Sequence, residues 1–130
     1  ANLSHANLSH ANLSHANLSS TNLSHANLSS TNLSYANLSS ANLQSCTLPL
    51  SLKGVNLSDV NLSKRFDFVN KDMSGANLSG ANLSHANFSN TNLSGANLSS
   101  AKLFHASLSG ANLLGCTLPL SLRGVNLSDV

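Results

Sequence analysis

Apolar positions recur every five residues along the chain. The opening ANLSHANLSHANLSH puts Leu at the centre of each unit, and Leu keeps that place from Leu3 through Leu48. In an α-helix five residues advance about 500°, so successive leucines would form no common face. In a flat strand an odd period would send successive leucines to opposite faces. A chain that turns a corner after each unit would instead point every Leu the same way.

The residue two before each central Leu lies on the same side of an extended segment. It is almost always Ala, Thr or Cys, as at Thr21, Thr31 and Thr91, and only small residues suit a tight corner next to a packed core. Asn, Ser and the fifth residue of each unit then face outward. The pattern predicts a β-solenoid with an inner stack of Leu and small residues and backbone hydrogen bonds between its coils.

The units ANLSH, ANLSS, TNLSH and ANLSG match the A(D/N)LXX signature, and the chain resembles the pentapeptide repeat proteins over most of its length. The resemblance implies an all-β, right-handed quadrilateral β-helix with four units per coil. On that basis 130 residues make 26 units and about 6.5 coils. At about 4.8 Å per coil, the rod would be about 31 Å long.

We expect irregular units near residues 46–54, 64–72 and 116–124. CTLP is a four-residue unit, after which LSLKG and VNLSD run one residue out of phase, and an extra residue near Arg65 restores the register. Phe66 and Lys71 then fall on inward small-residue positions, which suit neither. We expect a bulge or short protruding loop between Lys64 and Asp72, and a partner-docking site is the alternative.

A longer repeat overlies the short one. Residues 1–60 align with 71–130, and 43 of these 60 positions are identical. The 70-residue repeat equals 14 units, or three and a half coils, so each copy would be turned half a revolution from the last. We expect residues 1–130 to form a single β-solenoid that is a segment of a longer rod.

The charged residues give little support to catalysis or to nucleic-acid binding. The four acidic residues are Asp59, Asp67, Asp72 and Asp129, the first and last being copies of one position, and no base partners the many serines. We predict no enzyme and no cofactor. A net charge of +2 suits neither nucleic-acid binding nor the acidic DNA mimicry by which some pentapeptide repeat proteins protect topoisomerases. No apolar run reaches the roughly 18 residues of a membrane span.

The charges are also unevenly placed. Residues 1–52 carry none, and seven of the ten charged residues fall between Lys53 and Asp72. Charges normally stop the exposed edges of β-structures from pairing with other chains. The uncharged stretch therefore predicts self-association into a rod or filament.

Histidine and cysteine offer weaker signals. His5, His25, His85 and His105 are separated by multiples of 20 and would share one face, as weak candidate metal ligands with no third ligand evident. A tolerant outward position explains them equally well, and we predict no metal site. Cys46 and Cys116 occupy the same place in two copies of CTLPL. They would lie on opposite faces, about 17 Å apart along the axis, beyond the reach of a disulfide, and we expect buried free thiols.

The Asn-Leu-Ser core of the repeat is also an N-glycosylation acceptor sequence. Either the outward asparagines carry N-glycans, or Asn and Ser serve the fold and create the sequence by accident. We expect a structural segment of an extracellular or cell-surface rod, glycosylated on these asparagines; the alternative is a binding module of unassigned role, with a cytoplasmic location also open. The sixteen candidates are Asn2, Asn7, Asn12, Asn17, Asn22, Asn27, Asn32, Asn37, Asn56, Asn61, Asn77, Asn82, Asn87, Asn92, Asn97 and Asn126.

Overall fold

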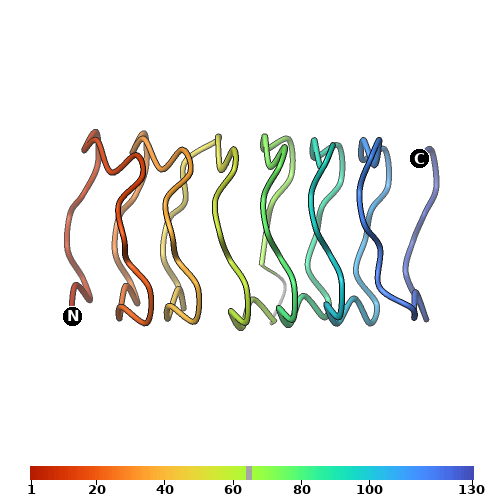
Figure 1. The fold of residues 1–130 in the computed structure, drawn as a ribbon, viewed down its shortest axis with the longest axis horizontal. Coiled ribbons are helices and arrows are strands. Elements are labelled where there is room, and N and C mark those ends of the chain that lie inside the picture. The colour runs from red at the N-terminus through yellow and green to blue at the C-terminus, as the bar shows by residue number, and fades with distance from the viewer. Residues whose placement is uncertain (64–65) are drawn as a thin grey trace.

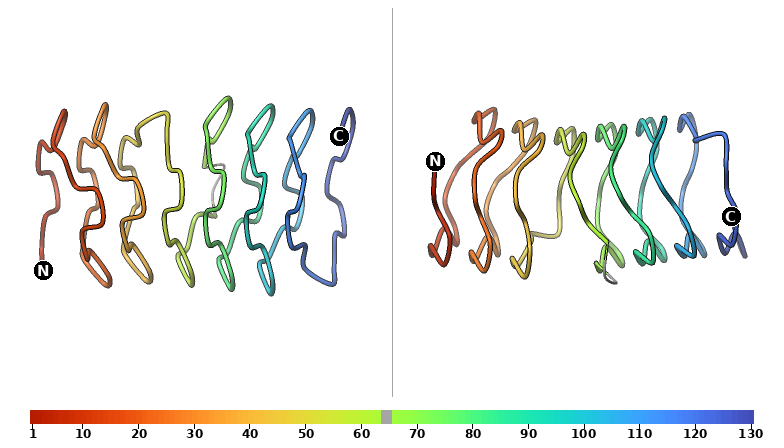
Figure 2. Two further views of the ribbon diagram at one scale, coloured as in Figure 1. Left: turned by 45° about the horizontal axis from the view of Figure 1, so that its top comes forward. Right: turned by 90° about the horizontal axis from the view of Figure 1, so that it is seen from below.

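The chain winds into a stack of coils with its two termini at opposite ends (Figure 1). A computed structural model describes residues 1–63 and 66–130. Over these residues there is no helix and no continuous strand, and the coils are joined by isolated parallel β-bridges. Two further views show the same succession of coils along one axis (Figure 2). The expected all-β solenoid is confirmed.

The bridges join outward residues of successive coils. They begin with Asn2↔Asn22 and Asn7↔Asn27, and each of these joins equivalent positions four regular units apart. Backbone hydrogen bonds flank each bridge: Leu3 N donates to Asn22 O at 2.8 Å, and Asn22 N donates to Ala1 O at 3.0 Å. Each unit therefore contributes one short extended segment to a ladder that runs along the rod.

The corner between units is a tight turn closed by the backbone. Ala6 N donates to Leu3 O at 3.1 Å, and the residue before Ala6, His5, has φ 61°. An i to i+3 hydrogen bond with positive φ at the third residue is the signature of a type II turn. The fifth residue of every regular unit that the structure describes has positive φ, whether it is His, Ser, Asn, Asp, Tyr or Gly. The bend that the five-residue period requires is thus placed at one position.

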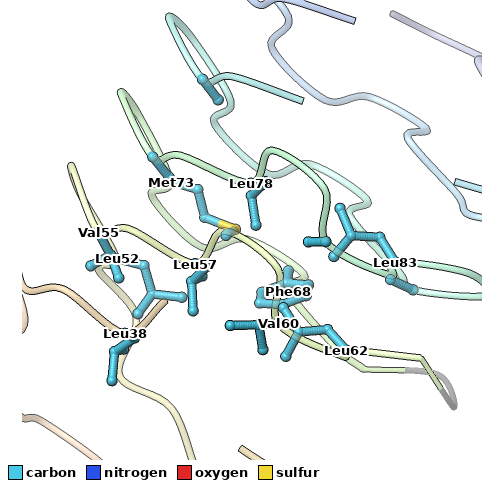
Figure 3. Close-up of a cluster of buried hydrophobic side chains, with 14 of the residues drawn as sticks. Leu38, Leu52, Val55, Leu57, Val60, Leu62, Phe68, Met73, Leu78 and Leu83 are labelled. Carbon is cyan, nitrogen blue, oxygen red and sulfur yellow. The ribbon is translucent and has the colours of Figure 1, made fainter. Parts of the chain in front are cut away.

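The core is the stack of central residues. Leu23, Leu28, Leu33 and Leu38 are completely buried. Figure 3 shows leucines and Phe68 from successive coils projecting into the middle of the rod. The small inward position is buried in the middle coils, as at Ala26 and Ala76. Two of its threonines bond their hydroxyls to the backbone: Thr31 Oγ1 donates to Leu8 O at 2.8 Å, and Thr91 Oγ1 donates to Phe68 O at 2.6 Å.

The irregular units change the spacing of the bridges. Asn37 pairs with Asn56, one position short of four full units, which confirms the shortened CTLP unit. Ser51 pairs with Asp72, one position beyond four full units, so one residue has been added back before Asp72. Phe68 then stacks on Phe88 with ring centroids 4.8 Å apart, which confirms the register predicted for FDFVN. The part of the bulge expected between Lys64 and Asp72 that falls on residues 64–65 lies outside the described residues.

One apolar position behaves differently from the pattern. Leu50 begins the LSLKG unit, where an inward small residue is usual, yet it is 73% exposed while Pro49 is buried. The shortened unit has no fifth residue, and neither Pro49 nor Leu50 has a positive φ. Because the usual corner is missing, the first side chain of the next unit points outward. Its copy Leu120 is exposed as well.

The copies of the 70-residue repeat supply a matched test of core packing. Leu57 is completely buried, whereas its copy Leu127 is 42% exposed. We expect Leu57→Ala to lower the free energy of unfolding by about 2–5 kcal/mol, because it leaves a cavity between coils. Leu127→Ala should lower it by less than about 1.5 kcal/mol, because less apolar area leaves water there. Urea denaturation followed by circular dichroism measures both, and equal losses would contradict this packing.

Candidate functional site

The outward asparagines hold the turns. Asn7 Oδ1 accepts hydrogen bonds from Ser9 N at 3.1 Å and from Ser9 Oγ at 2.7 Å, and the bond to the N–H two residues on recurs along the chain. Asp67 and Asp72 make the same bond, to Val69 N at 2.9 Å and Ser74 N at 3.0 Å. Such local bonds favour turns over regular strands. We call the outward Asn and Asp residues at the second position of each unit the asparagine row. Their side chains stabilise the turns of the solenoid.

Amide groups of the row also bond to each other along the rod. Asn42 Nδ2 donates to Asn22 Oδ1 at 3.2 Å, and Asn112 Nδ2 donates to Asn92 Oδ1 at 3.3 Å. Asn92 Nδ2 in turn donates to Asp72 Oδ1 at 3.3 Å. Neither Asn42 nor Asn112 is followed by the Ser or Thr that N-glycosylation requires. An Asn in this row is therefore useful to the fold without a glycan.

The candidate glycosylation sites divide by exposure. Nine are half-buried, and Nδ2 of Asn27, the atom that would carry a sugar, donates to Asn7 Oδ1 at 3.4 Å. Glycan attachment needs an accessible amide, so the exposed group is the better placed, and its occupancy stays a prediction. The seven exposed candidates are Asn2, Asn7, Asn12, Asn17, Asn32, Asn61 and Asn126.

The histidine pairs lie as their spacing predicted. The rings of His5 and His25 stack with centroids 4.8 Å apart and an interplanar angle of 4°, and those of His85 and His105 stack at 5.4 Å. Rings stacked face to face do not turn their nitrogens toward a common point. No group of three His, Cys, Asp or Glu side chains converges within 1–63 and 66–130. The four histidines stay weak candidate ligands, and the expectation of no metal site stays a prediction.

The cysteines are free, as predicted, but they are half-buried rather than buried. Cys46 occupies an inward small-residue position beside an opening between two coils, and this opening accounts for its partial exposure. Burial raises the pKa of the Cys46 thiol to about 12, against a smaller lowering by Lys71. Burial also raises the pKa of the Cys116 thiol. Neither is the activated thiolate that nucleophilic chemistry needs.

The opening at Cys46 is the larger of two hollows described here. We call it the cleft; its volume is about 540 Å³, within the range of pockets that enclose small ligands. One wall belongs to residues 42–48, and the described residues of the other wall lie within 61–63 and 66–71. The lining residues are Asn42, Gln44, Ser45, Cys46, Thr47 and Leu48 on one wall, and Asn61, Ser63, Phe66, Asp67 and Lys71 on the other.

The cleft lies where the inter-coil ladder is interrupted. Asn42 and Thr47 each bridge to the preceding coil, at Asn22 and Asn27, but within the described residues neither bridges to the following one. The ladder resumes beyond the cleft with Asn61↔Asn82 and Asp67↔Asn87. Asn32 also bridges only to the preceding coil, at Asn12, although Tyr35 N on that side still donates to Lys53 O at 3.0 Å. Within the described residues, the sides of Asn42 and Thr47 therefore have no bridge across this coil step, which lies between the shortened unit and the place where the register is restored.

Lys71 closes one corner of the cleft. Its Nζ donates to Pro49 O at 2.9 Å and to Leu48 O at 3.4 Å, two carbonyls of the shortened unit. Burial lowers the pKa of the Lys71 ammonium, and the carboxylate of Asp67 opposes that shift. Lys71 thus reaches its predicted inward position by placing its charged end on carbonyl oxygens. This explains how a lysine is accommodated at a small-residue site.

A second, smaller hollow of about 260 Å³ lies near the C-terminal coils. Phe104 and Lys102 stand where the repeat usually has Ser and Asn, and they line it with Arg123, whose guanidinium is 5.9 Å from the Phe104 ring centroid. Phe104 also packs edge-on against His85 and His105. This is a mixed aromatic and cationic patch on the surface of the rod.

Sequence reasoning located the irregular units but not the cleft. The sequence contained two relevant signals: the missing residue in CTLP, and the unsuitable Phe66 and Lys71 at inward positions. The first predicts a four-residue unit, and the second predicts a bulge or loop between Lys64 and Asp72, with a partner-docking site as the alternative. The opening actually follows from the interplay of two register changes that lie in adjacent coils, which a linear pattern does not display.

Comparisons with known proteins agree with this architecture. The family profile described as pentapeptide repeats matches the chain in eight copies, over residues 1–34, 11–48, 65–95, 72–110 and 96–119. No curated protein sequence matches the chain significantly. Among the described residues, no helix is long and apolar enough to cross a membrane.

Several solved structures are similar. HetL, a pentapeptide repeat protein involved in heterocyst differentiation regulation from the cyanobacterium Nostoc sp. strain PCC 7120, shares 29% identity over 98% of this chain and 62% of its own, with a TM-score of 0.41. Rfr23 from the cyanobacterium Cyanothece 51142 shares 32% identity over 81% of this chain and 58% of its own, with a TM-score of 0.31. The chain therefore spans about three fifths of the length of these two relatives.

The Cys46 thiol supplies a test with a defined pH window. Its pKa in the folded chain is about 12, above the ordinary value of 9.0, so the unfolded chain loses this proton first as the pH rises. Stability due to the protonated thiol is complete below pH 9.0 and is lost progressively as the pH approaches 12. In urea titrations at several pH values in this window, the free energy of unfolding of Cys46→Ala should fall less with rising pH than that of the parent. Identical pH dependence in the two proteins would contradict the burial of this thiol.

Proposed function

The chain belongs to the pentapeptide repeat family, and on that premise we propose that its role is structural: it is a segment of a long β-solenoid rod. The observation that supports this most directly is the junction between the two copies of the 70-residue repeat. Repeat architectures gain stability from each neighbour-to-neighbour contact, so a repeat that stacks on itself can extend indefinitely.

The junction uses the same contacts as the interior of each copy. Ser51 of the first copy bridges to Asp72 of the second, and Asn56 bridges to Asn77. Leu57 N donates to Asn77 O at 2.7 Å, a bond of the same kind and length as those within a copy. Buried Leu57 and Leu78 continue the core across the junction. Further copies added in tandem would meet the same surface.

The proposal includes the finer geometry of the family. Bridges between positions four units apart support a quadrilateral coil and about 6.5 coils for this segment. The right-handed winding is what membership of the family implies. Self-association of rods, end to end or side by side, also belongs to the proposal. It is supported by the low charge of residues 1–52 and by the exposed Leu114, Leu120 and Val130.

We further propose an extracellular or cell-surface location, with N-glycans on the exposed asparagines. The support is the sixteen acceptor sequences and the outward direction of their side chains. Adjacent coils are only about 4.8 Å apart, so glycans on every site of a row would collide. Occupancy of a subset, drawn from the seven exposed sites, fits this spacing and would help to keep a weakly charged rod in solution.

Tandem chains test the rod. Proteins that carry one, two and four copies of residues 1–70 should remain folded, and small-angle X-ray scattering should show the length increasing by about 17 Å per copy at constant cross-section. This increment corresponds to three and a half coils. A chain of four copies in which every Leu57 is replaced by Asp is the control for loss of the continuous core. Scattering curves of the parent series that fit flexibly linked beads instead of a rigid rod would overturn the proposal.

The glycans are tested on the protein from its natural source. We expect an intact mass above 13.4 kDa for this segment, heterogeneous, that collapses to the protein mass after enzymatic removal of N-glycans. Mapping of the deamidated sites should place the sugars on the exposed members inside the stack, Asn32 and Asn61, rather than on half-buried Asn27 or Asn92. A protein-only mass would return the asparagines to a purely structural role and remove the support for an extracellular location.

A second candidate function, a protein-binding module, is favoured by one observation. The cleft interrupts the regular succession of coils and has a volume of about 540 Å³. The two functions are compatible, because a rod with one cleft in each 70-residue repeat would present binding sites at regular intervals.

A further inference from the structure

We propose that the cleft binds a short extended segment of a partner protein, which adds a β-strand between the two open coil edges. This inference goes beyond the structural role and does not depend on it. The occupant is defined by its chemistry: an uncharged segment in which a polar, an apolar and a polar residue follow one another.

The backbone of the cleft walls supplies the first part of the argument. In the regular coil steps the N–H of a central Leu donates to the next coil, as Leu23 N does to Asn42 O at 2.8 Å. Among the described residues, Leu43 and Leu48 make no such bond, and the N–H groups of Asn61 and Asp67 on the facing wall make none either. Open N–H and C=O groups at a strand edge are the groups to which an added strand binds.

The side chains of the cleft define what an added strand should carry. Outward, Asn42 Oδ1 accepts the N–H of Gln44 at 3.1 Å, while its Nδ2 is used on Asn22 of the preceding coil. Elsewhere in the row an Asn of the next coil donates to such an oxygen, as Asn112 Nδ2 does to Asn92 Oδ1 at 3.3 Å, so a polar donor side chain on the partner would take that place. Inward, Leu48 and Phe66 are half-buried apolar groups of the two walls, and an apolar side chain would lie between them.

Charge and volume narrow the occupant further. Asp67 and Lys71 are the only charged residues of the described lining and have opposite signs, so neither a polyanion nor a polycation is favoured. The Lys71 ammonium is also already bonded to two carbonyl oxygens. A cleft of about 540 Å³ has room for a short segment and not for a folded domain. It suits a segment of about four residues, which is about 13 Å long when extended.

The repeat unit itself has this chemistry, and it supplies the probe. The probe is a fluorescein-labelled acetyl-Ala-Asn-Leu-Ser-Gly amide, with the sequence of residues 76–80. Its matched twin carries N-methyl-leucine, which removes one backbone donor and keeps every side chain. We expect saturable binding of the probe to the full chain by fluorescence polarisation, weakened at least about tenfold in the twin. Equal affinity for both peptides would overturn strand addition.

Two tryptophan variants locate the binding. Thr47 is exposed at the cleft, and its copy Thr117 is exposed at a place where no cleft is found among the described residues. We expect Thr47→Trp to weaken probe binding at least about tenfold by filling the cleft, and Thr117→Trp to leave it unchanged. Melting temperatures establish that both variants are folded. Equal binding by the two variants would place the peptide on the end coils and overturn the proposal.

Hydrogen exchange gives an independent readout on the unmodified chain. When the probe is bound, the amides of Leu43, Leu48 and Asn61 should exchange more slowly, while amides in regular coils should not change. Protection confined to the terminal coils, or absence of saturable binding, would overturn the proposal. The lengths of the tandem chains are measured without any peptide. The proposal of peptide binding can therefore fail while the proposal of the rod stands, and the rod can fail while peptide binding stands.

Discussion

The left-handed corner at the fifth residue is the constraint on which the structure depends. A non-glycine residue at positive φ costs of order 1–3 kcal/mol, yet His5, Ser20 and Tyr35 all adopt it. Each corner is offset by local bonds: the turn bond that closes on the central Leu, and the bond from the fifth N–H to the next coil, such as His5 N to Ser24 O at 2.9 Å. Without this bend, the period of five would scatter the leucines, and no continuous core could form.

The asparagine row follows from that corner. The Asn side chain accepts the N–H of the residue two positions on, inside the turn, and its amide can donate to the row member of the adjacent coil. Asp offers the first bond but has no donor for the second, and stacked carboxylates only about 4.8 Å apart would repel one another. Asn is therefore favoured by the fold itself. The density of glycosylation sequences is consequently weaker evidence for glycans than their number suggests, and exposure discriminates better among them.

Much of the fold could be predicted because each residue type in the unit has one physical task. Five-residue spacing gave the corner, central Leu gave the core, and the one-residue loss in CTLP gave the shortened bridge spacing from Asn37 to Asn56. The exposure of Leu50 and the incomplete burial of Cys46 could not be predicted from the pattern. Both depend on how a shortened unit meets the next coil, which is a contact between residues that lie about one full coil apart along the chain.

The same reasoning explains why a candidate binding site arises at the register change. Regular units satisfy their backbone on both neighbouring coils, which leaves little for a partner to bind except exposed side chains. Where one unit loses a residue and a later one regains it, the two neighbouring coils part, and Lys71 compensates only the carbonyls of Leu48 and Pro49. The remaining N–H groups, of which Leu43 and Asn61 face the cleft from opposite walls, keep the bonding capacity that the rest of the solenoid has used. The regular units thus form the rod, and the unused backbone N–H groups available to a partner lie together at this register change.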